Sequence, residues 1–156
     1  MAIWWEDGER AYGGPKGMSD AQMADARRTP EYKEYVGKIL GAKIKEGIEQ
    51  AMAGQLIGSR PVRLDIVVKN FTIPSAAFRI LIGGSPQMIA AATLVDARTG
   101  AVIIANPELQ AGVFSGNGLV GVAVQAAIDN ASKQTAEGKL VASYGQAYRE
   151  WLTHGV

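Results

Sequence analysis

Apolar and polar positions alternate most regularly in the middle of the chain. Val62, Leu64, Ile66 and Val68 alternate with mostly polar residues, the period of two expected of a strand with one face on a core. Three shorter apolar runs follow, at residues 78–82, 88–95 and 101–105, with turn signals between them. We therefore predict an α+β protein whose sheet, over residues 60–114, is an antiparallel meander of about four strands.

Details of this pattern predict how the sheet is built. Residues 88–95 are apolar on both faces and rich in alanine, which indicates a central strand with another element packed closely over it. Phe71 breaks the alternation of the first strand and predicts a bulge or bend before Pro74. Asp96 is most simply a turn residue, and Asn106-Pro107 ends or bends the last strand.

The flanking segments have helical spacing. Thr29-Pro30-Glu31 combines a capping hydroxyl, a proline at the first helical position and an acidic first turn, so we predict a helix over residues 29–53. Apolar residues recur at helical spacing again over residues 118–153, in one helix or in two with a break near residues 135–138. We expect these helices to lie on one face of the sheet.

Residues 1–28 are expected to be an extended and loop segment of the same single domain, which spans residues 1–156. Ile3 to Trp5 is predicted to be a short strand packed on the body, because two adjacent tryptophans are a large apolar surface. We favour a core anchor over a ligand-stacking platform. The glycine-rich part that follows is predicted to be a loop.

Composition narrows the classes of function. With 16 basic and 15 acidic residues the net charge is +1, so no overall field favours nucleic acid or an anionic membrane. The lack of cysteine excludes disulfides and thiolate sites. No apolar run is long enough to cross a bilayer, and Glu6 and Asp7 interrupt any signal peptide, so we expect either a cytoplasmic protein or one whose export sequence has been removed.

One chemical motif is present in the sequence. Gly116, Gly118 and Gly121 fit the glycine pattern that brings backbone amides onto a pyrophosphate. A dinucleotide site also needs a following parallel strand that ends in an acidic residue, and here helix follows instead. We therefore interpret the motif as a tight loop with close helix-to-sheet packing, and keep a small-ligand or nucleotide-binding site as the alternative.

No catalytic or metal-binding set is evident, so we expect a protein that is not an enzyme and holds no cofactor. The only histidine, His154, lies beside the C-terminus, and Ser75 and Ser85 lack the context of a nucleophile. A carboxylate enzyme would need two carboxylates to face each other across a cleft. The sequence spacing pairs none of the candidates Asp65, Asp96, Glu108 and Asp129.

The order of the turns resembles a family of uncharacterised bacterial envelope lipoproteins. The residues that carry the resemblance are Ser59-Arg60-Pro61-Val62, Ile73-Pro74-Ser75-Ala76, Ile82-Gly83-Gly84, Leu94-Val95-Asp96-Ala97-Arg98-Thr99-Gly100, Gly116-Asn117-Gly118 and Tyr148-Arg149-Glu150-Trp151-Leu152. It covers most of the chain from about Trp4, and its motifs are turns with no catalytic signature.

The resemblance implies a small α+β domain of the periplasm or of the periplasmic face of the outer membrane. Members of the family usually start with an export sequence and a lipidated cysteine, and both are missing here, so we expect membrane contact only through a lipid anchor that this chain lacks. We expect a non-enzymatic protein that binds another protein or itself. The alternative function is a small-ligand or nucleotide-binding domain that uses the loop from Gly116 to Gly121, and the alternative location is the cytoplasm.

Overall fold

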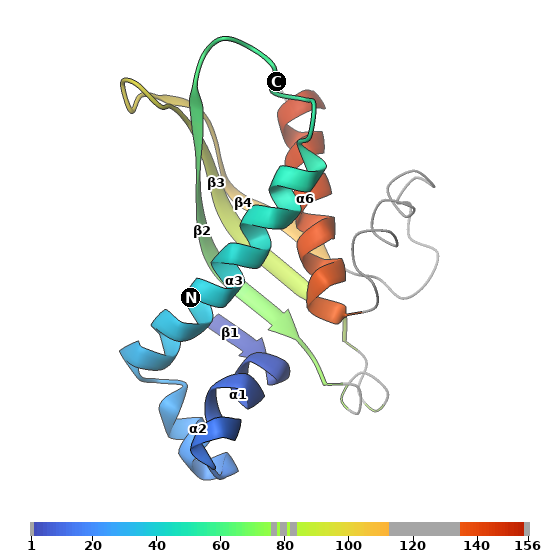
Figure 1. The fold of residues 1–156 in the computed structure, drawn as a ribbon. Coiled ribbons are helices and arrows are strands. Elements are labelled where there is room, and N and C mark those ends of the chain that lie inside the picture. The colour runs from blue at the N-terminus through green and yellow to red at the C-terminus, as the bar shows by residue number, and fades with distance from the viewer. Residues whose placement is uncertain (1, 76–77, 79–80, 82–83, 113–134, 155–156) are drawn as a thin grey trace.

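The computed structural model describes residues 2–75, 78, 81, 84–112 and 135–154, and the fold is α+β, as predicted (Figure 1). One sheet is covered by helices. Its strands are β1 (Ala2–Trp5), β2 (Val62–Ile73), β3 (Gln87–Asp96) and β4 (Val102–Gly112). The helices are α1 (Glu6–Gly13), α2 (Asp20–Ala26), α3 (Pro30–Ala51) and α6 (Ala136–His154), with a short 3-10 helix, η1 (Gly14–Lys16).

The four strands lie side by side in the order β1-β2-β3-β4. The pairs β2–β3 and β3–β4 are antiparallel, whereas β1 is parallel to β2 and pairs only with Asn70 to Ile73. The register of β2 on β3 shifts between Val68 and Asn70, which confirms the predicted irregularity before Pro74. β4 continues through Asn106-Pro107, so this dipeptide does not end the strand, and the register shifts there instead.

The prediction that residues 78–82 form the second strand of the meander is wrong at Phe78 and Leu81, the two of these residues that the structure describes. Phe78 and Leu81 are helical. The Oγ of Ser75 accepts a hydrogen bond from the backbone N–H of Phe78 (3.2 Å), the local contact by which serine starts a helical turn. This short-range bond prevails over the alternation of apolar residues. The sheet instead gains a strand from the N-terminal segment: β1 contains Ile3 to Trp5, which the sequence predicted to be a short strand.

The prediction of loop after Trp5 is also wrong, because α1, η1 and α2 occupy that segment. Acidic residues in the first turn of α1 complement its dipole, and Ser19 and Gln22 form a capping box at the start of α2. Gly8 serves packing: a Cβ there would lie 2.4 Å from the ring of Trp5. Helix signals within the segment therefore prevail over its glycine content.

The long helix α3 begins as predicted. The Thr29 Oγ1 accepts from the backbone N–H of Tyr32 (3.2 Å), and Pro30 is the first helical residue. One face of the helix is apolar and lies on the core, with six residues buried: Tyr32, Val36, Leu40, Ile44, Ile48 and Ala51.

Helices α3 and α6 cross at a close contact between glycines. A Cβ on Gly145 would lie 2.6 Å from the carbonyl oxygen of Gly47, and one on Gly47 would lie 2.4 Å from Val141. The two helices lie together on one face of the sheet (Figure 1), as the sequence predicted for the helices flanking it. The C-terminal helix expected before residue 135 falls outside the described residues.

The core lies between these helices and the sheet. Met88, Ala90 and Ala92 of β3 are fully buried, which confirms the prediction of a central third strand under close packing. Phe71, Leu40 and Tyr144 fill the space from β2, α3 and α6. Among the helices described, none is both long and apolar enough to span a bilayer.

Candidate functional site

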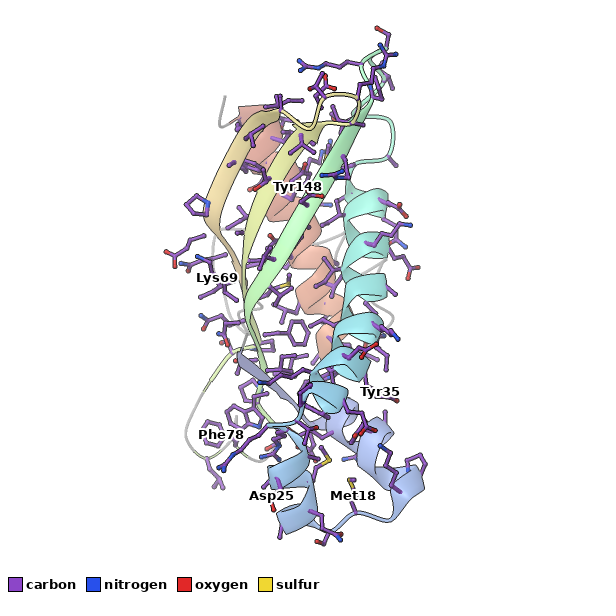
Figure 2. All side chains as sticks on the ribbon, turned by 90° about the vertical axis from the view of Figure 1, so that its left-hand side faces the viewer. Met18, Asp25, Tyr35, Lys69, Phe78 and Tyr148 are labelled. Atoms are coloured by element: carbon purple, nitrogen blue, oxygen red, sulfur yellow. The ribbon has the colours of Figure 1, made fainter. Side chains whose placement is uncertain are left out.

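A groove of about 500 Å³ runs between α3 and β2. Its floor is apolar: Ile44 and Ile48 come from the inner face of α3, and Leu64, Ile66 and Val68 from the helix-facing side of β2. Ile44 and Ile48 are buried, whereas the three strand residues are only partly buried. Figure 2 shows α3 beside β2, with Lys69 on the opposite side of the sheet. The groove is therefore an incompletely covered part of the core.

The charged side chains around the groove are paired with one another. On α3, the Lys45 Nζ lies 3.8 Å from the Glu49 Oε1. On β2, Arg63 donates two hydrogen bonds to Asp65, of 2.8 and 2.9 Å. This guanidinium lowers the pKa of Asp65, and the carboxylate raises the pKa of Arg63. The groove thus offers an apolar floor between ion pairs, without a surplus of one charge in these pairs.

A second hollow, of about 480 Å³, lies between the N-terminal segment and α3. The Lys16 Nζ lies 3.5 Å from the centre of the Tyr12 ring and 3.1 Å from the Glu31 Oε1. Tyr12 also packs edge-on against Tyr32 and Tyr35. Lys16, Glu31 and Tyr12 thus hold α1 and η1 against α3, whereas Glu34 and Lys38, which also line the hollow, pair with each other on α3.

Three of the four carboxylates considered for catalysis are each held by a different basic residue. Asp65 pairs with Arg63, Asp96 with Arg60 (2.7 Å), and Glu108 with Lys69 (3.9 Å). Asp129 lies outside the described residues. Within the described ranges, no three histidine, aspartate or glutamate side chains are placed to hold a metal ion.

Asp96 is the turn residue that the sequence predicted. Its Oδ1 accepts from the backbone N–H groups of Arg98 (2.8 Å) and Thr99 (3.0 Å), and its Oδ2 accepts from Arg60. Gly100 completes the turn with a φ of 73°. The hydrogen bond from Arg60, with those from the two backbone amides, lowers the pKa of Asp96 from 3.8 to about 2.

The glycines of the candidate nucleotide loop, Gly116, Gly118 and Gly121, lie outside the described residues. His154 is exposed, and its Nδ1 lies 2.8 Å from the Thr153 Oγ1. Ser75 caps a helical turn. The described residues therefore do not bring the candidate side chains of the sequence together at one site.

Sequence reasoning assigned the residues of the groove to the core and missed the groove itself. The available signal was a difference in length: Ile3 to Trp5 is too short to cover the whole of the alternating strand that begins at Val62. What could not be read from the sequence is that β1 pairs with the far end of β2.

Comparisons with known proteins give a family but no activity. A model of a family of unknown function, DUF6778, matches residues 33–156. Among solved structures, the fold is similar to a candidate lipoprotein from Caulobacter crescentus CB15, with 15% identity and a TM-score of 0.42 over 74% of this chain and 84% of that one. No curated protein matches the sequence.

Proposed function

The chain belongs to the family of unknown function DUF6778, and from this premise we propose that it is a non-enzymatic protein-binding or assembly domain of the bacterial cell envelope. The observation that carries the binding part is the apolar groove between α3 and β2, which adjoins a length of β2 with no neighbouring strand on its outer side in the described chain. Strand edges and apolar grooves are surfaces that proteins use to bind one another.

The non-enzymatic part is supported by the contacts of the three candidate carboxylates that the structure describes. A general acid or base needs a titratable group free to exchange a proton with a substrate. Here Asp65, Asp96 and Glu108 each face a basic partner, and Asp96 also accepts two backbone hydrogen bonds. These contacts stabilise the ionised form of Asp96 and use its oxygens for the turn.

The envelope location rests on the resemblance of the turn sequences alone. Cell fractionation of the native organism tests it separately, with antibody detection of the protein in periplasmic, membrane and cytoplasmic fractions. We expect the protein in the periplasmic or membrane fraction. Recovery with cytoplasmic markers would reject the location and leave the binding proposal intact.

Photo-crosslinking in native cells tests the binding function. A benzoylphenylalanine replaces Val62 at the groove in one strain and Glu108 on β4 in another, and adducts are identified by mass spectrometry. We expect one recurring protein to be attached through position 62. The proposal fails when neither position, nor a further set spread over the exposed surface, gives a protein adduct. Adducts confined to position 108 would support a protein-binding function but would show that the partner contacts β4 and not the groove.

A further inference from the structure

The edge of β2 is only partly covered. On the side of β2 away from β3, β1 pairs only with Asn70 to Ile73. The preceding stretch, residues 62–68, has no strand on that side in the part of the chain that the structure describes. An uncovered strand edge presents backbone donors and acceptors that a further strand can use.

The register identifies which backbone groups face outward. The backbone N–H of Ala97 donates to the carbonyl oxygen of Pro61 (3.0 Å), so these two residues are a hydrogen-bonded pair of the antiparallel ladder. Since such pairs alternate, and the register is regular up to Val68, the N–H and C=O groups of Val62, Leu64 and Ile66 point away from β3.

The same residues line the apolar groove. The side chains of Leu64 and Ile66 lie on the helix-facing side of β2, opposite Ile44 and Ile48 of α3. A strand added to this edge would place every second side chain on that same side. Backbone hydrogen bonds and an apolar pocket are therefore available to one extended segment at one place.

From this coincidence we infer that the partner presents an extended segment, which adds as a strand beside residues 62–68 of β2 and inserts alternate apolar side chains into the groove under α3. This inference rests on the proposed protein-binding function and names the chemistry of the partner. Pro61 at one end, and the register shift together with β1 at the other, limit the segment to about six to eight residues.

Charge gives a second copy of this chain no advantage over a segment of another protein. Antiparallel pairing of two copies centred on Asp65 places the two Asp65 carboxylates opposite each other, and centring on Ile66 places Arg63 opposite Lys69. Centring on Leu64 places Arg63 opposite Asp65, but these two residues already pair with each other within each chain. Because the ion pairs Lys45–Glu49 and Arg63–Asp65 satisfy the groove's rim charges internally, recognition depends on backbone and apolar contacts. Binding should change little with salt.

Defined peptides test the inference on the unmodified protein. One array holds eight-residue peptides with Val, Ile, Leu or Phe at alternate positions and Thr or Lys between them, and a matched array has the same compositions with the apolar residues clustered. We expect alternating peptides to bind and clustered ones not to bind. The best peptide is then N-methylated at every second residue in either phase, and only one phase should abolish binding.

Amide hydrogen exchange locates the contact. In the free protein, the amides of Leu64 and Ile66 should exchange fast and those of Asp65 and Val67 slowly, because only the latter pair with β3. The bound peptide should slow exchange at Leu64 and Ile66. The variant Ile66→Pro removes one outward N–H and should weaken binding by about tenfold or more.

Each negative result has its own meaning. The strand-addition model is rejected if clustered peptides bind as well as alternating ones, if neither array binds, or if both methylation phases are tolerated. A concentration-dependent dimer that Ile66→Pro converts to monomer would assign the edge to a second copy instead. Adducts at position 62 in cells, without peptide binding, would preserve the protein-binding function and overturn this mode of recognition.

Discussion

At the scale of single residues, Asp96 shows how one side chain fixes the turn between β3 and β4. It is buried, and its two oxygens accept hydrogen bonds from Arg60 and from the amides of Arg98 and Thr99. All three contacts favour the carboxylate over the neutral acid, so the pKa of Asp96 falls to about 2. The position therefore ties a local turn to the chain just before β2.

This pKa predicts a pH dependence for the stability of the protein. Because the pKa of Asp96 is depressed in the folded state, its contribution is complete above the ordinary pKa of 3.8 and is lost as pH falls through about 2. Asp96→Asn should therefore lower the melting temperature at pH 7 and have progressively less effect below pH 4. Thermal unfolding of both proteins from pH 2 to pH 7 measures this.

Asp65→Asn is the control for that prediction. The pKa of Asp65 is lowered by Arg63 alone, on an exposed strand face, so the substitution should change the melting temperature less than Asp96→Asn does. A difference between wild type and Asp96→Asn that stays constant down to pH 2 would contradict the role assigned to the ionised turn residue.

At the scale of elements, the crossing of α3 and α6 depends on the absence of side chains at two positions. Gly47 and Gly145 let the helix backbones approach so closely that a Cβ at position 145 would meet a carbonyl oxygen at 2.6 Å. A carbonyl in the middle of a helix cannot rotate away as a flexible side chain can, so the helices themselves would have to separate. The sheet-facing core of both helices would loosen with them.

We expect Gly145→Ala to destabilise the protein by about 1–3 kcal/mol, because the added methyl group overpacks the crossing. Gly37→Ala on the same α3 is the matched control: a Cβ there meets no atom within 4 Å, so the higher helix propensity of alanine should stabilise by about 0.5–1 kcal/mol. Urea unfolding of the two variants measures both. Equal effects of the two substitutions would show that the crossing tolerates a side chain.

The elements that were predictable from the sequence are those with a strong local signal. The strongest signals are the cap at Thr29 with Pro30 after it, the alternation of β2 and the alanine-rich sequence of β3. Each of them determines its structure within a few residues. The strand expected around Phe78 failed because the hydroxyl of Ser75 offers a competing local bond. The helices α1 and α2 were not predicted because the glycines of this segment favour a loop, although Ser19 and Gln22 form a capping box.

The candidate site was less predictable than the fold. The apolar character of Leu64 and Ile66 was evident, but whether such a residue is covered depends on elements far away in sequence. Here it depends on β1 pairing with Asn70 to Ile73 and leaving the earlier part of β2 open. Pairings between strands so far apart in sequence depend on the tertiary structure, so they cannot be predicted from a short stretch of sequence.

At the scale of the whole molecule, Trp5 joins the N-terminal segment to the body. Its ring packs edge-on against Phe71 of β2, with centroids 5.9 Å apart, and lies directly against Gly8 of α1. It is 4% exposed, so it is the core anchor that the sequence predicted, whereas its neighbour Trp4 is 39% exposed and contacts Phe78. The two adjacent tryptophans therefore have different roles.

Trp5→Ala should destabilise the protein by about 3–5 kcal/mol, because it leaves a cavity between β1, β2 and α1. Trp4→Ala, the matched control, should cost about 0.5–1.5 kcal/mol through its aromatic contact. Chemical unfolding followed by circular dichroism measures both. Similar losses for the two variants would show that the N-terminal segment is not anchored through Trp5.

The parallel pairing of β1 has a consequence for the order of folding. Ala2 to Trp5, which are synthesised before the other strands, find their partners only at Asn70 to Ile73, whereas β2, β3 and β4 pair with their neighbours along the chain. Contacts distant in sequence carry a larger loop-closure entropy and form late. During synthesis on the ribosome, Trp4 and Trp5 must therefore stay without their strand partners until β2 has emerged. Until then, this exposed apolar segment of the nascent chain is one that a chaperone can bind.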